Sequence, residues 1–377
     1  MADSQAKGSR AKPGRSASVG IITTVQLVRL DFSPLDERLG VAGVRWSKGL
    51  QRLGVWLAMR TGSYQSAVEG VRESIGVEVS KTSLWRVVQA QGEQVQQRLA
   101  SEAVGQSQLP PRGQVVVGEH KHDGKMGLGV DGVYIQLIEE GWKEVKIGAA
   151  FEIVALSDRE KQSRLSQKER LGLDIAEVRQ MVKATAISYC ALLGSVEEFE
   201  PYLWAEACRR QLPLCWDTVL IGDGAEWIDG LYQRCFYDSV RIVDWYHACE
   251  HLAGLARQSF AEASQKGQPW LARRKDQLWQ GDVAAVVCAI GQLDLNPADR
   301  NREANYFSKH ARAMTYLEFC ELGLPVGSGV VEGGGCKGIV EGRLKRVGMR
   351  WSRSGAQHML ALCCEYGSGR WEQIWAV

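Results

Sequence analysis

Residues 126–138 read MGLGVDGVYIQLI, a stretch that is rich in glycine at its start and rich in β-branched and aromatic residues after it. This pattern is typical of a strand inside a sheet. Asp131 interrupts the apolar run, and a carboxylate in the middle of a sheet is costly unless it is paired or bound to a metal ion. The stretch therefore predicts a strand that carries a reactive group, although Asp131 followed by Gly132 is also typical of a β-bulge.

Apolar segments further along the chain predict four more strands. We expect these strands at residues 145–155, 185–193, 218–221 and 239–243. The charged stretch 157–182 is expected to be a surface excursion that contains a helix. Ser195 and Glu198 form a capping-box pattern, which predicts a helix that ends near Arg210, and another helix is expected to start near Glu226.

The order of these elements is three strands, then helix, strand, helix and strand. This is the order of an α/β fold with a mixed five-stranded RNase H-like sheet, in which the first strand lies beside the fourth, in parallel. Parallel neighbours need a helical crossover, and the helix at 195–210 supplies one. After residue 243 the sequence is mostly helical, with a last helix from about Gly335 to Ser352 and a further one at 355–366.

A second carboxylate, Asp223, follows the fourth predicted strand between Gly222 and Gly224. If the first and fourth strands are neighbours, Asp131 and Asp223 point into one cleft at the carboxyl end of the fourth strand, where open sheets bind ligands. Taken alone, Asp223 is also typical of a turn residue or a helix cap. Only the pair of acids favours a functional site.

A third acid is expected on a later helix, and Glu332, in Gly-Ser-Gly-Val-Val-Glu, is the best placed. The alternative role for Glu332 is a first-turn glutamate that the helix dipole favours. Three converging carboxylates repel one another and attract hard divalent cations such as Mg²⁺ or Mn²⁺. Two such ions assist phosphodiester displacement. We therefore predict that Asp131, Asp223 and Glu332 bind metal and are catalytic.

A further polar cluster, Asp244-Trp245-Tyr246-His247, follows the fifth predicted strand. If a helix begins here, Asp244 and His247 lie close together, and His247 is placed to donate a hydrogen bond to a phosphate. A helix cap is the alternative interpretation of Asp244. A zinc site made by His247 and His251 is another alternative, but the sequence shows no definite third ligand.

Residues 45–100 show two apolar helical stripes, a short turn at Gly76 and a third stripe that Ser80 is placed to cap. This is the pattern of a helix-turn-helix, whose second helix enters the major groove of DNA. The predicted DNA-contacting, outward residues are Lys81, Arg86 and Gln89. A plain helical hairpin is the alternative.

Residues 337–353 form a basic segment near the predicted third acid. Clustered cations neutralise phosphates, and a flat aromatic side chain stacks on a base. The predicted DNA-contacting residues are Lys337, Arg343, Lys345, Arg346 and Arg350, with Trp351 as a supporting aromatic. A solvated basic helix face is the alternative.

Composition limits the class of protein. The 377 residues are 45% hydrophobic and 24% charged, which is typical of a globular chain, and 46 basic against 44 acidic residues leave a charge of only +2. Any surface that binds nucleic acid must therefore arise from local clustering. No apolar run is long enough for a membrane span, no secretory signal is evident, and the 10 Cys show no zinc or disulfide spacing. We expect a cytoplasmic protein.

Five motifs together resemble the bacterial insertion-sequence transposases of the ISKra type, which have a DDE catalytic core. The motifs are Val130–Gly132 with Gly141–Gly148, Ile221–Ile228, Ile242–Ala248, Gly327–Glu332 and Gly348–Ser352. The resemblance spans residues 45–365. It implies that Asp131, Asp223 and Glu332 are the metal-binding triad and that Asp244-x-x-His247 is similar to a signature of several transposase superfamilies. The three glycines after Glu332 exceed the usual pattern, and each loosens a helix by about 1 kcal/mol.

The resemblance implies a domain order as well as an activity. Composition predicts a disordered basic tail (1–18), and the helical pattern predicts a helix-turn-helix region with a linker (19–110). With the resemblance, the rest is expected to be the first part of the RNase H-like core (111–247), an α-helical insertion (248–322) and the completion of the core (323–377). The expected activity is Mg²⁺-dependent cleavage and strand transfer at the terminal inverted repeats of a mobile element. Double-stranded DNA and a homodimer or larger synaptic complex, associated with the nucleoid, are the expected partners. The alternatives are an inactive, transposase-derived DNA-binding protein and a nuclease without strand transfer.

Overall fold

The computed structural model describes residues 46–106, 122–171, 176, 179–260 and 266–376. The chain divides into two units, residues 1–53 and 54–377, and the account below concerns the second. The predicted basic tail, residues 1–18, lies outside the described residues. Within the described part of the chain, no helix is long and apolar enough to cross a membrane.

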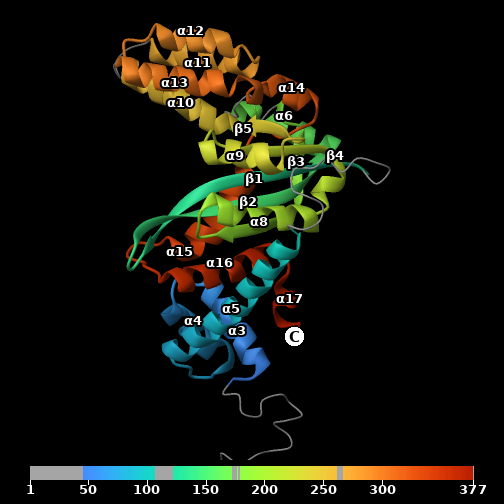
Figure 1. Ribbon diagram of the computed structural model, residues 1–377, viewed down its shortest axis with the longest axis vertical. Helices are drawn as coiled ribbons and strands as arrows, with labels where there is room; N and C mark the ends of the chain where they lie inside the picture. The colour runs from blue at the N-terminus through green and yellow to red at the C-terminus, as the bar shows by residue number, and fades with distance from the viewer. Residues whose placement is uncertain (1–45, 107–121, 172–175, 177–178, 261–265, 377) are drawn as a thin grey trace, which may run out of the picture. The chain divides into compact units, whose positions relative to one another are not determined.

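A mixed five-stranded sheet organises the second unit (Figure 1). Its strands are β1 (His122–Leu137), β2 (Gly141–Ala155), β3 (Val182–Leu192), β4 (Cys215–Gly222) and β5 (Val240–Val243), in the order β3-β2-β1-β4-β5. β2 is antiparallel to β1 and β3, whereas β4 is parallel to β1 and β5. The predicted parallel contact of the first and fourth strands is confirmed.

The pairing of β1 with β2 is regular through the acidic position. Partners run without a break from Met126, opposite Glu152, to Leu137, opposite Gly141. Asp131 therefore does not lie at a β-bulge, and its side chain shares a face of the sheet with that of its partner Ile147.

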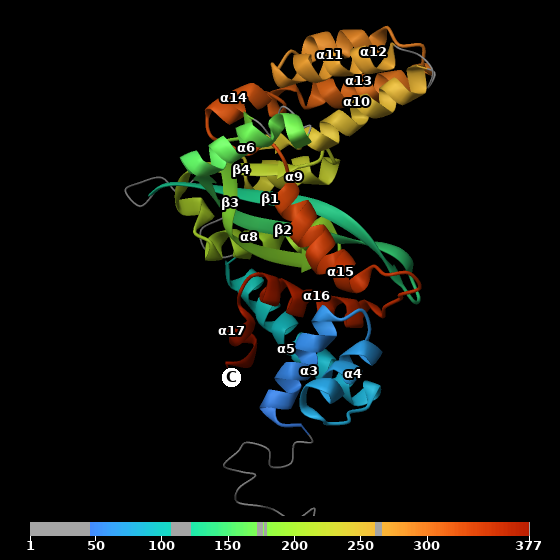
Figure 2. The same ribbon diagram turned by 180° about the vertical axis from the view of Figure 1, so that it is seen from behind.

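Helices cover both faces of the sheet (Figure 2). On one face, Leu128 and Val130 of β1 pack with apolar residues of α8 (Val196–Arg209) and α9 (Glu226–Cys235). The opposite face carries Asp131 and is crossed by the π-helix η3 (Val330–Glu341), whose Val331 packs against Gly129. The predicted capping box of α8 is present, because Ser195 accepts from the Glu198 amide and Glu198 accepts from the Ser195 amide.

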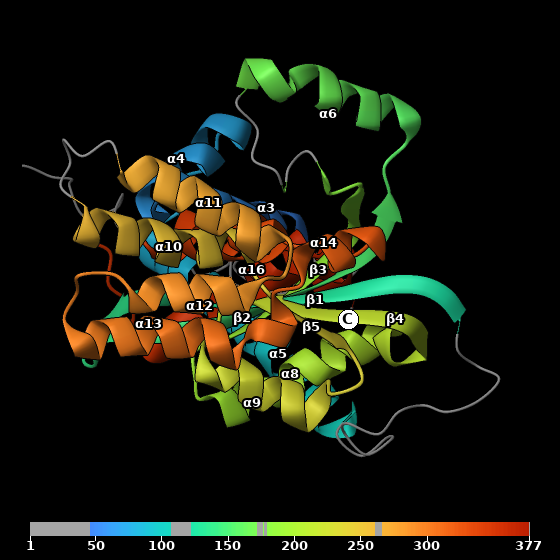
Figure 3. The same cartoon turned by 90° about the horizontal axis from the view of Figure 1, so that it is seen from above.

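A group of helices follows β5, as predicted for residues 248–322 (Figure 3). Its members are α10 (Trp245–Ser259), α11 (Gly267–Trp279), α12 (Val283–Gly291), α13 (Pro297–Lys309) and α14 (Tyr316–Glu321). Trp245, Trp279 and Tyr316 form its aromatic centre, with Trp245 edge-on to both rings. The charged excursion after β2 contains α6 (Asp158–Leu171), and two short 3-10 turns occur at η1 (Leu212–Leu214) and η2 (Ala311–Ala313).

The predicted helix pattern of the N-terminal region is also observed. The helices are α3 (Lys48–Arg60), α4 (Tyr64–Ile75) and α5 (Lys81–Gln106). Ser63 caps α4, Gly76 ends it with a left-handed φ of 68°, and the Ser80 hydroxyl accepts from the Ser83 amide at 3.1 Å. Because α5 extends to Gln106, residues 101–106 of the expected linker (101–113) are helical, and the rest of the linker lies outside the described residues.

The C-terminal helices depart from the prediction. The helix that was expected from about Gly335 to Ser352 instead comprises η3 and α15 (Gly342–Leu344), and it is followed by a loop before α16 (Arg353–Gly367) and α17 (Trp371–Trp375). The loop is held by the sheet, because the Trp351 amide donates to Gln136 O at 3.1 Å and Trp351 O accepts from the Ile138 amide at 2.9 Å. Pairing with β1 outweighs the local helical preference of this basic segment.

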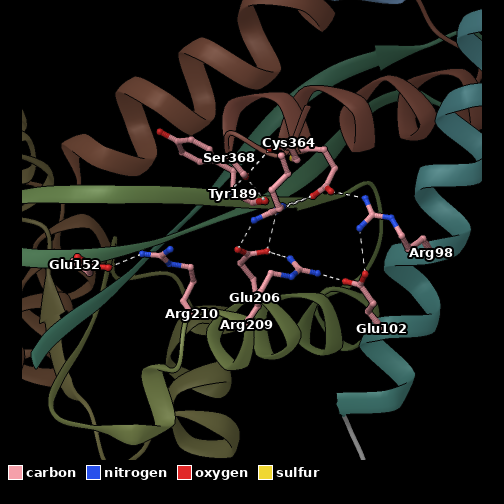
Figure 4. Close-up of polar contacts among 11 residues, drawn as sticks. Arg98, Glu102, Glu152, Tyr189, Glu206, Arg209, Arg210, Cys364 and Ser368 are labelled. Atoms are coloured by element: carbon pink, nitrogen blue, oxygen red, sulfur yellow. Dashed lines mark hydrogen bonds and ion pairs between the residues drawn. The ribbon is translucent and has the colours of Figure 1, made fainter. Parts of the chain in front are cut away.

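A network of charged side chains, of which Glu206, Glu365 and Arg370 are buried, ties α5 to the core (Figure 4). Arg98 of α5 contacts Glu365 of α16 at 2.5 Å, and Glu102 of α5 pairs with Arg209 of α8, which also pairs with Glu206. Arg370 bridges Glu206 and Glu365 at 3.0 and 2.7 Å. The long helix of the predicted DNA-binding region is therefore fixed to two helices that pack on the sheet.

Candidate functional site

The first predicted acid lies on β1, and the second directly follows the neighbouring strand β4. β1 and β4 run parallel with Gly129 opposite Ile221, so Asp131 and Asp223, two residues further along each chain segment, come at the same level of the sheet. A Cβ atom at Gly222 would lie 2.7 Å from Val130 O, so only glycine permits this close approach. The glycine before Asp223 thus allows the two carboxylates to be neighbours.

The Asp131 carboxylate is partly buried and accepts two hydrogen bonds. Its Oδ1 accepts from the Gly132 amide at 2.6 Å, and its Oδ2 accepts from Cys336 Sγ at 3.2 Å. Burial raises the pKa of the Asp131 carboxyl, and the nearby charges of Asp223 and Glu332 raise it too, against the effect of the two hydrogen bonds. Asp131 therefore interacts electrostatically with each of the other two acids.

Glu332 lies in the first turn of η3, where Ser328 orients it. The Ser328 hydroxyl donates to Glu332 Oε1 at 2.6 Å, and the Ser328 amide donates to Asp244 Oδ2. Asp244 is buried and caps α10, because its Oδ1 accepts from the His247 amide at 2.7 Å. The helix-cap interpretation of Asp244 is confirmed, and this residue couples the start of α10 to the turn that carries Glu332.

A pocket of about 370 Å³ opens over these groups. It is lined by Asp131, Glu332 and His247, and by the cationic side chains of Lys337 and Lys345. Both lysines are exposed. The pocket thus brings two of the predicted catalytic acids together with His247, the predicted hydrogen-bond donor to a phosphate, and with two of the predicted DNA-contacting residues.

Asp223 lies beside this pocket and has its own supporting contacts. Its Oδ1 accepts from the Ala225 amide at 2.9 Å, so it also acts as the turn residue that the sequence allowed. Arg241 donates to Asp223 O at 2.5 Å, and the Tyr306 ring packs against Gly224, where a Cβ atom would lie 2.3 Å from the ring. Arg241 is a charged residue inside an apolar strand, the same signal that singled out Asp131, whereas no sequence signal indicated Tyr306.

The chemistry of the three acids suits a hard divalent cation, but their arrangement is open. Carboxylate oxygens are the ligands that Mg²⁺ and Mn²⁺ prefer, and burial, with a further effect from the charges of Asp223 and Glu332, raises the pKa of Asp131. Among the described residues, no group of three or more His, Cys, Asp or Glu side chains is close enough to hold a metal ion. The donor set fits the cation, and the distances do not show a closed site.

Three of the predicted DNA contacts, Trp351, Arg343 and Gln89, are corrected by the structure. Trp351 is buried and its Nε1 donates to Leu344 O at 3.1 Å, so its ring packs inside the protein and does not stack on a base. Arg343 is buried, donates from Nε to Ala58 O at 2.5 Å and lies over the rings of Tyr64 and Trp351. Burial lowers the pKa of Arg343. It serves the packing between α15 and the N-terminal helices and does not face DNA.

Gln89 was predicted to face outward, but the structure turns it inward. Its Oε1 accepts from His358 Nδ1 at 2.9 Å, and its Nε2 is buried. Lys81 and Arg86 on the same helix are exposed, as are Arg346 and Arg350 on the loop after α15. These four remain available to a polyanion, whereas Gln89 joins α5 to α16.

Comparison with known proteins identifies no family for this chain. No protein-family model matches the chain, and no curated protein matches its sequence.

Proposed function

We propose that this protein is a DDE transposase that binds the terminal inverted repeats of an insertion sequence and catalyses metal-dependent DNA cleavage and strand transfer. The observation that carries the proposal is that Asp131 on β1 and Asp223 at the end of the parallel neighbour β4 come at the same level of the sheet, and that Glu332 lines one pocket with Asp131. The order β3-β2-β1-β4-β5 is consistent with an RNase H-like sheet. The five motifs that resemble ISKra-type transposases support the same assignment.

In this proposal, Asp131, Asp223 and Glu332 hold Mg²⁺ or Mn²⁺, whose chemistry there is to activate an attacking oxygen and to stabilise a leaving one. Cys336 and Ser328 orient two of these carboxylates through the hydrogen bonds described above. His247 lines the pocket and donates a hydrogen bond to a phosphate oxygen. Asp244 holds His247 in place through the cap of α10.

DNA approaches the pocket along exposed cations. Lys337 and Lys345 line the pocket itself, and Arg346 and Arg350 follow on the adjoining loop. Each neutralised phosphate releases counterions, so binding weakens as salt rises. Helices α4 and α5, with Lys81 and Arg86 exposed at the start of α5, form the helix-turn-helix that recognises the element ends. Joining two ends requires at least a dimer on DNA.

The test is cleavage of a plasmid that carries the coding sequence with its native flanking DNA, in Mg²⁺. Asp131→Asn and Asp223→Asn should each abolish cleavage and leave binding to a fragment of the flanking DNA intact. Asp217→Asn is the matched control, since this exposed carboxylate lies on β4 and pairs only loosely with Lys125 at 3.6 Å. Cleavage retained in both active-site variants would defeat the assignment.

A second candidate is a catalytically inactive, transposase-derived DNA-binding protein. The observation that favours it is the open spacing of the acids, since the described residues contain no group close enough to hold a metal ion. This protein would bind its flanking DNA equally well with and without Mg²⁺ and would not nick it. The same plasmid assay separates the two candidates, and an added target plasmid separates a transposase from a nuclease that cuts without joining.

A further inference from the structure

Two histidines of α10 point their ring nitrogens at one another. His247 and His251 are four residues apart and so lie on one face of the helix. Their Nε2 atoms are 3.3 Å apart. Two histidine nitrogens bound to one tetrahedral zinc ion at about 2.0–2.1 Å each lie about 3.3–3.4 Å apart. The pair is therefore spaced as two ligands of one zinc ion are spaced.

The opposite ring nitrogens of both histidines face carboxylates. His251 Nδ1 lies 2.7 Å from Glu303 Oε2, and His247 Nδ1 lies 3.9 Å from Glu250 Oε2. The Glu303 carboxylate favours the tautomer of His251 that carries its proton on Nδ1, which leaves the Nε2 lone pair of His251 for a metal ion, whereas Glu250 lies beyond hydrogen-bond distance of His247. Histidines that bind metal in proteins almost always have such a partner.

The His251 ring is held in place by its neighbours. Tyr306 of α13 stacks on it with ring centroids 4.1 Å apart and planes 15° apart, and Phe307 contacts it edge-on. Glu303 comes from the same helix and is only 13% exposed. His251 is therefore preorganised by α13, which reduces the conformational entropy that this residue loses when it binds a metal ion.

Solvent has room to complete the coordination. A pocket of about 270 Å³ is lined by His247, His251, Glu250 and Glu303, and by Gly254, Leu255 and Gln258. A water molecule occupies about 30 Å³ in the liquid, so several fit. The sequence alone showed no third ligand, and within the described residues no third His, Cys, Asp or Glu joins the pair.

We infer that His247 and His251 form a binding site for Zn²⁺, with two protein ligands, water in the remaining positions, and Glu303 as the positioning residue of His251. Imidazole nitrogens prefer zinc, whereas the carboxylates of Asp131, Asp223 and Glu332 prefer Mg²⁺ or Mn²⁺. The inference stands on this local geometry and does not depend on the proposed function. His247 also lines the pocket of about 370 Å³ over Asp131 and Glu332, so an ion here would lie at the wall of that pocket, and only Nδ1 of His247 would then be left to donate to a phosphate.

The test is calorimetric titration of Zn²⁺ into the full chain after removal of bound metals, in a large excess of Mg²⁺ so that the carboxylates face a hard cation. We expect one equivalent to bind. His247→Ala, whose ring is 37% exposed and so tolerates removal, and His251→Ala should abolish binding. Glu303→Gln should weaken it by about 10- to 100-fold.

The matched controls are Asp131→Asn and His358→Ala, which removes a histidine of α16 that is hydrogen-bonded to Gln89 of α5. Both should leave zinc binding unchanged. The absence of saturable binding to the wild type, or binding that survives His247→Ala in a folded protein, would overturn the inference. The close nitrogen contact would then be a hydrogen bond between the two imidazoles and nothing more.

Discussion

The thiol of Cys336 donates a hydrogen bond to Oδ2 of Asp131 across 3.2 Å, which joins η3 to the central strand of the sheet. The two residues are far apart in the sequence, and neither partner of this contact is fully exposed. Burial and the charge of Asp131 hold the pKa of the Cys336 thiol well above its usual range. The reactivity of the Cys336 thiol therefore depends on the charge of Asp131.

We predict that Cys336 is alkylated slowly at neutral pH, because only the thiolate reacts. Asp131→Asn removes the negative charge and should speed the labelling of Cys336, as measured by mass spectrometry of iodoacetamide adducts. The exposed Cys288 on α12 is the internal control and should react at the same rate in both proteins. Equal rates for Cys336 in the two proteins would contradict the contact.

The charged Asp131 carboxylate should destabilise the folded protein when no metal is bound. Its pKa is raised by burial and then by two neighbouring acids, so the charged form is less stable in the folded chain than in the unfolded chain. Asp131→Asn should therefore raise the melting temperature in the absence of metal. Mg²⁺ should raise the melting temperature of the wild type but not that of the variant. A lower melting temperature for metal-free Asp131→Asn would show that its hydrogen bonds outweigh the repulsion.

Asp229 is predicted to make stability depend on acid pH. Burial alone would raise the pKa of Asp229, but hydrogen bonds from His310 and Lys309 and the charge of Arg241 outweigh it and lower the pKa to about 2. A lowered carboxyl pKa stabilises the folded state above its unfolded value of about 4 and ceases to do so as pH falls towards about 2.

Asp229→Asn should thus cost about 1–2 kcal/mol near neutral pH, after allowance for solvent screening, and progressively less in acid. Urea denaturation at a series of pH values measures the difference. Asp217→Asn is the control, because this exposed residue should show little effect at any pH. A difference between wild type and Asp229→Asn that stays constant from neutral pH to strong acid would refute the assignment.

Arg370 should be the most sensitive member of the buried charge network. It pairs with Glu206 and Glu365, which are 2% and 0% exposed, so Arg370→Met leaves two buried carboxylates with less compensation. We expect a loss of about 3 kcal/mol in the free energy of unfolding. Arg353→Met breaks an exposed pair with Glu140 and should cost less than about 1 kcal/mol. Equal losses in the two variants would show that burial of the network adds nothing.

Local patterns in the sequence predicted the parts of the fold that depend on interactions between residues close together in the chain. The strand around Asp131, the capping box at Ser195 and the left-handed end of α4 at Gly76 all follow from short-range rules. The parallel contact of β1 and β4 followed from the order of elements and the need for a crossover helix.

The errors arose where distant partners decide the outcome. Arg343 lies in a basic run that suggested a DNA surface, yet Ala58 and the Tyr64 ring bury it. Gln89 has the period of an outward residue, yet α16 covers it. The contacts that orient the acids, such as Ser328 with Glu332, have no sequence signature of their own. The sequence next to a residue does not show whether an element far away in the chain will bury its side chain.

Anomalous diffraction from crystals grown with Mn²⁺ and flanking DNA tests the central claim most directly. The proposed function predicts manganese peaks that contact Asp131, Asp223 and Glu332 together, once DNA draws the acids around the ions. Manganese bound only elsewhere, or no manganese at these three carboxylates with DNA present, would contradict the claim that they form one catalytic site.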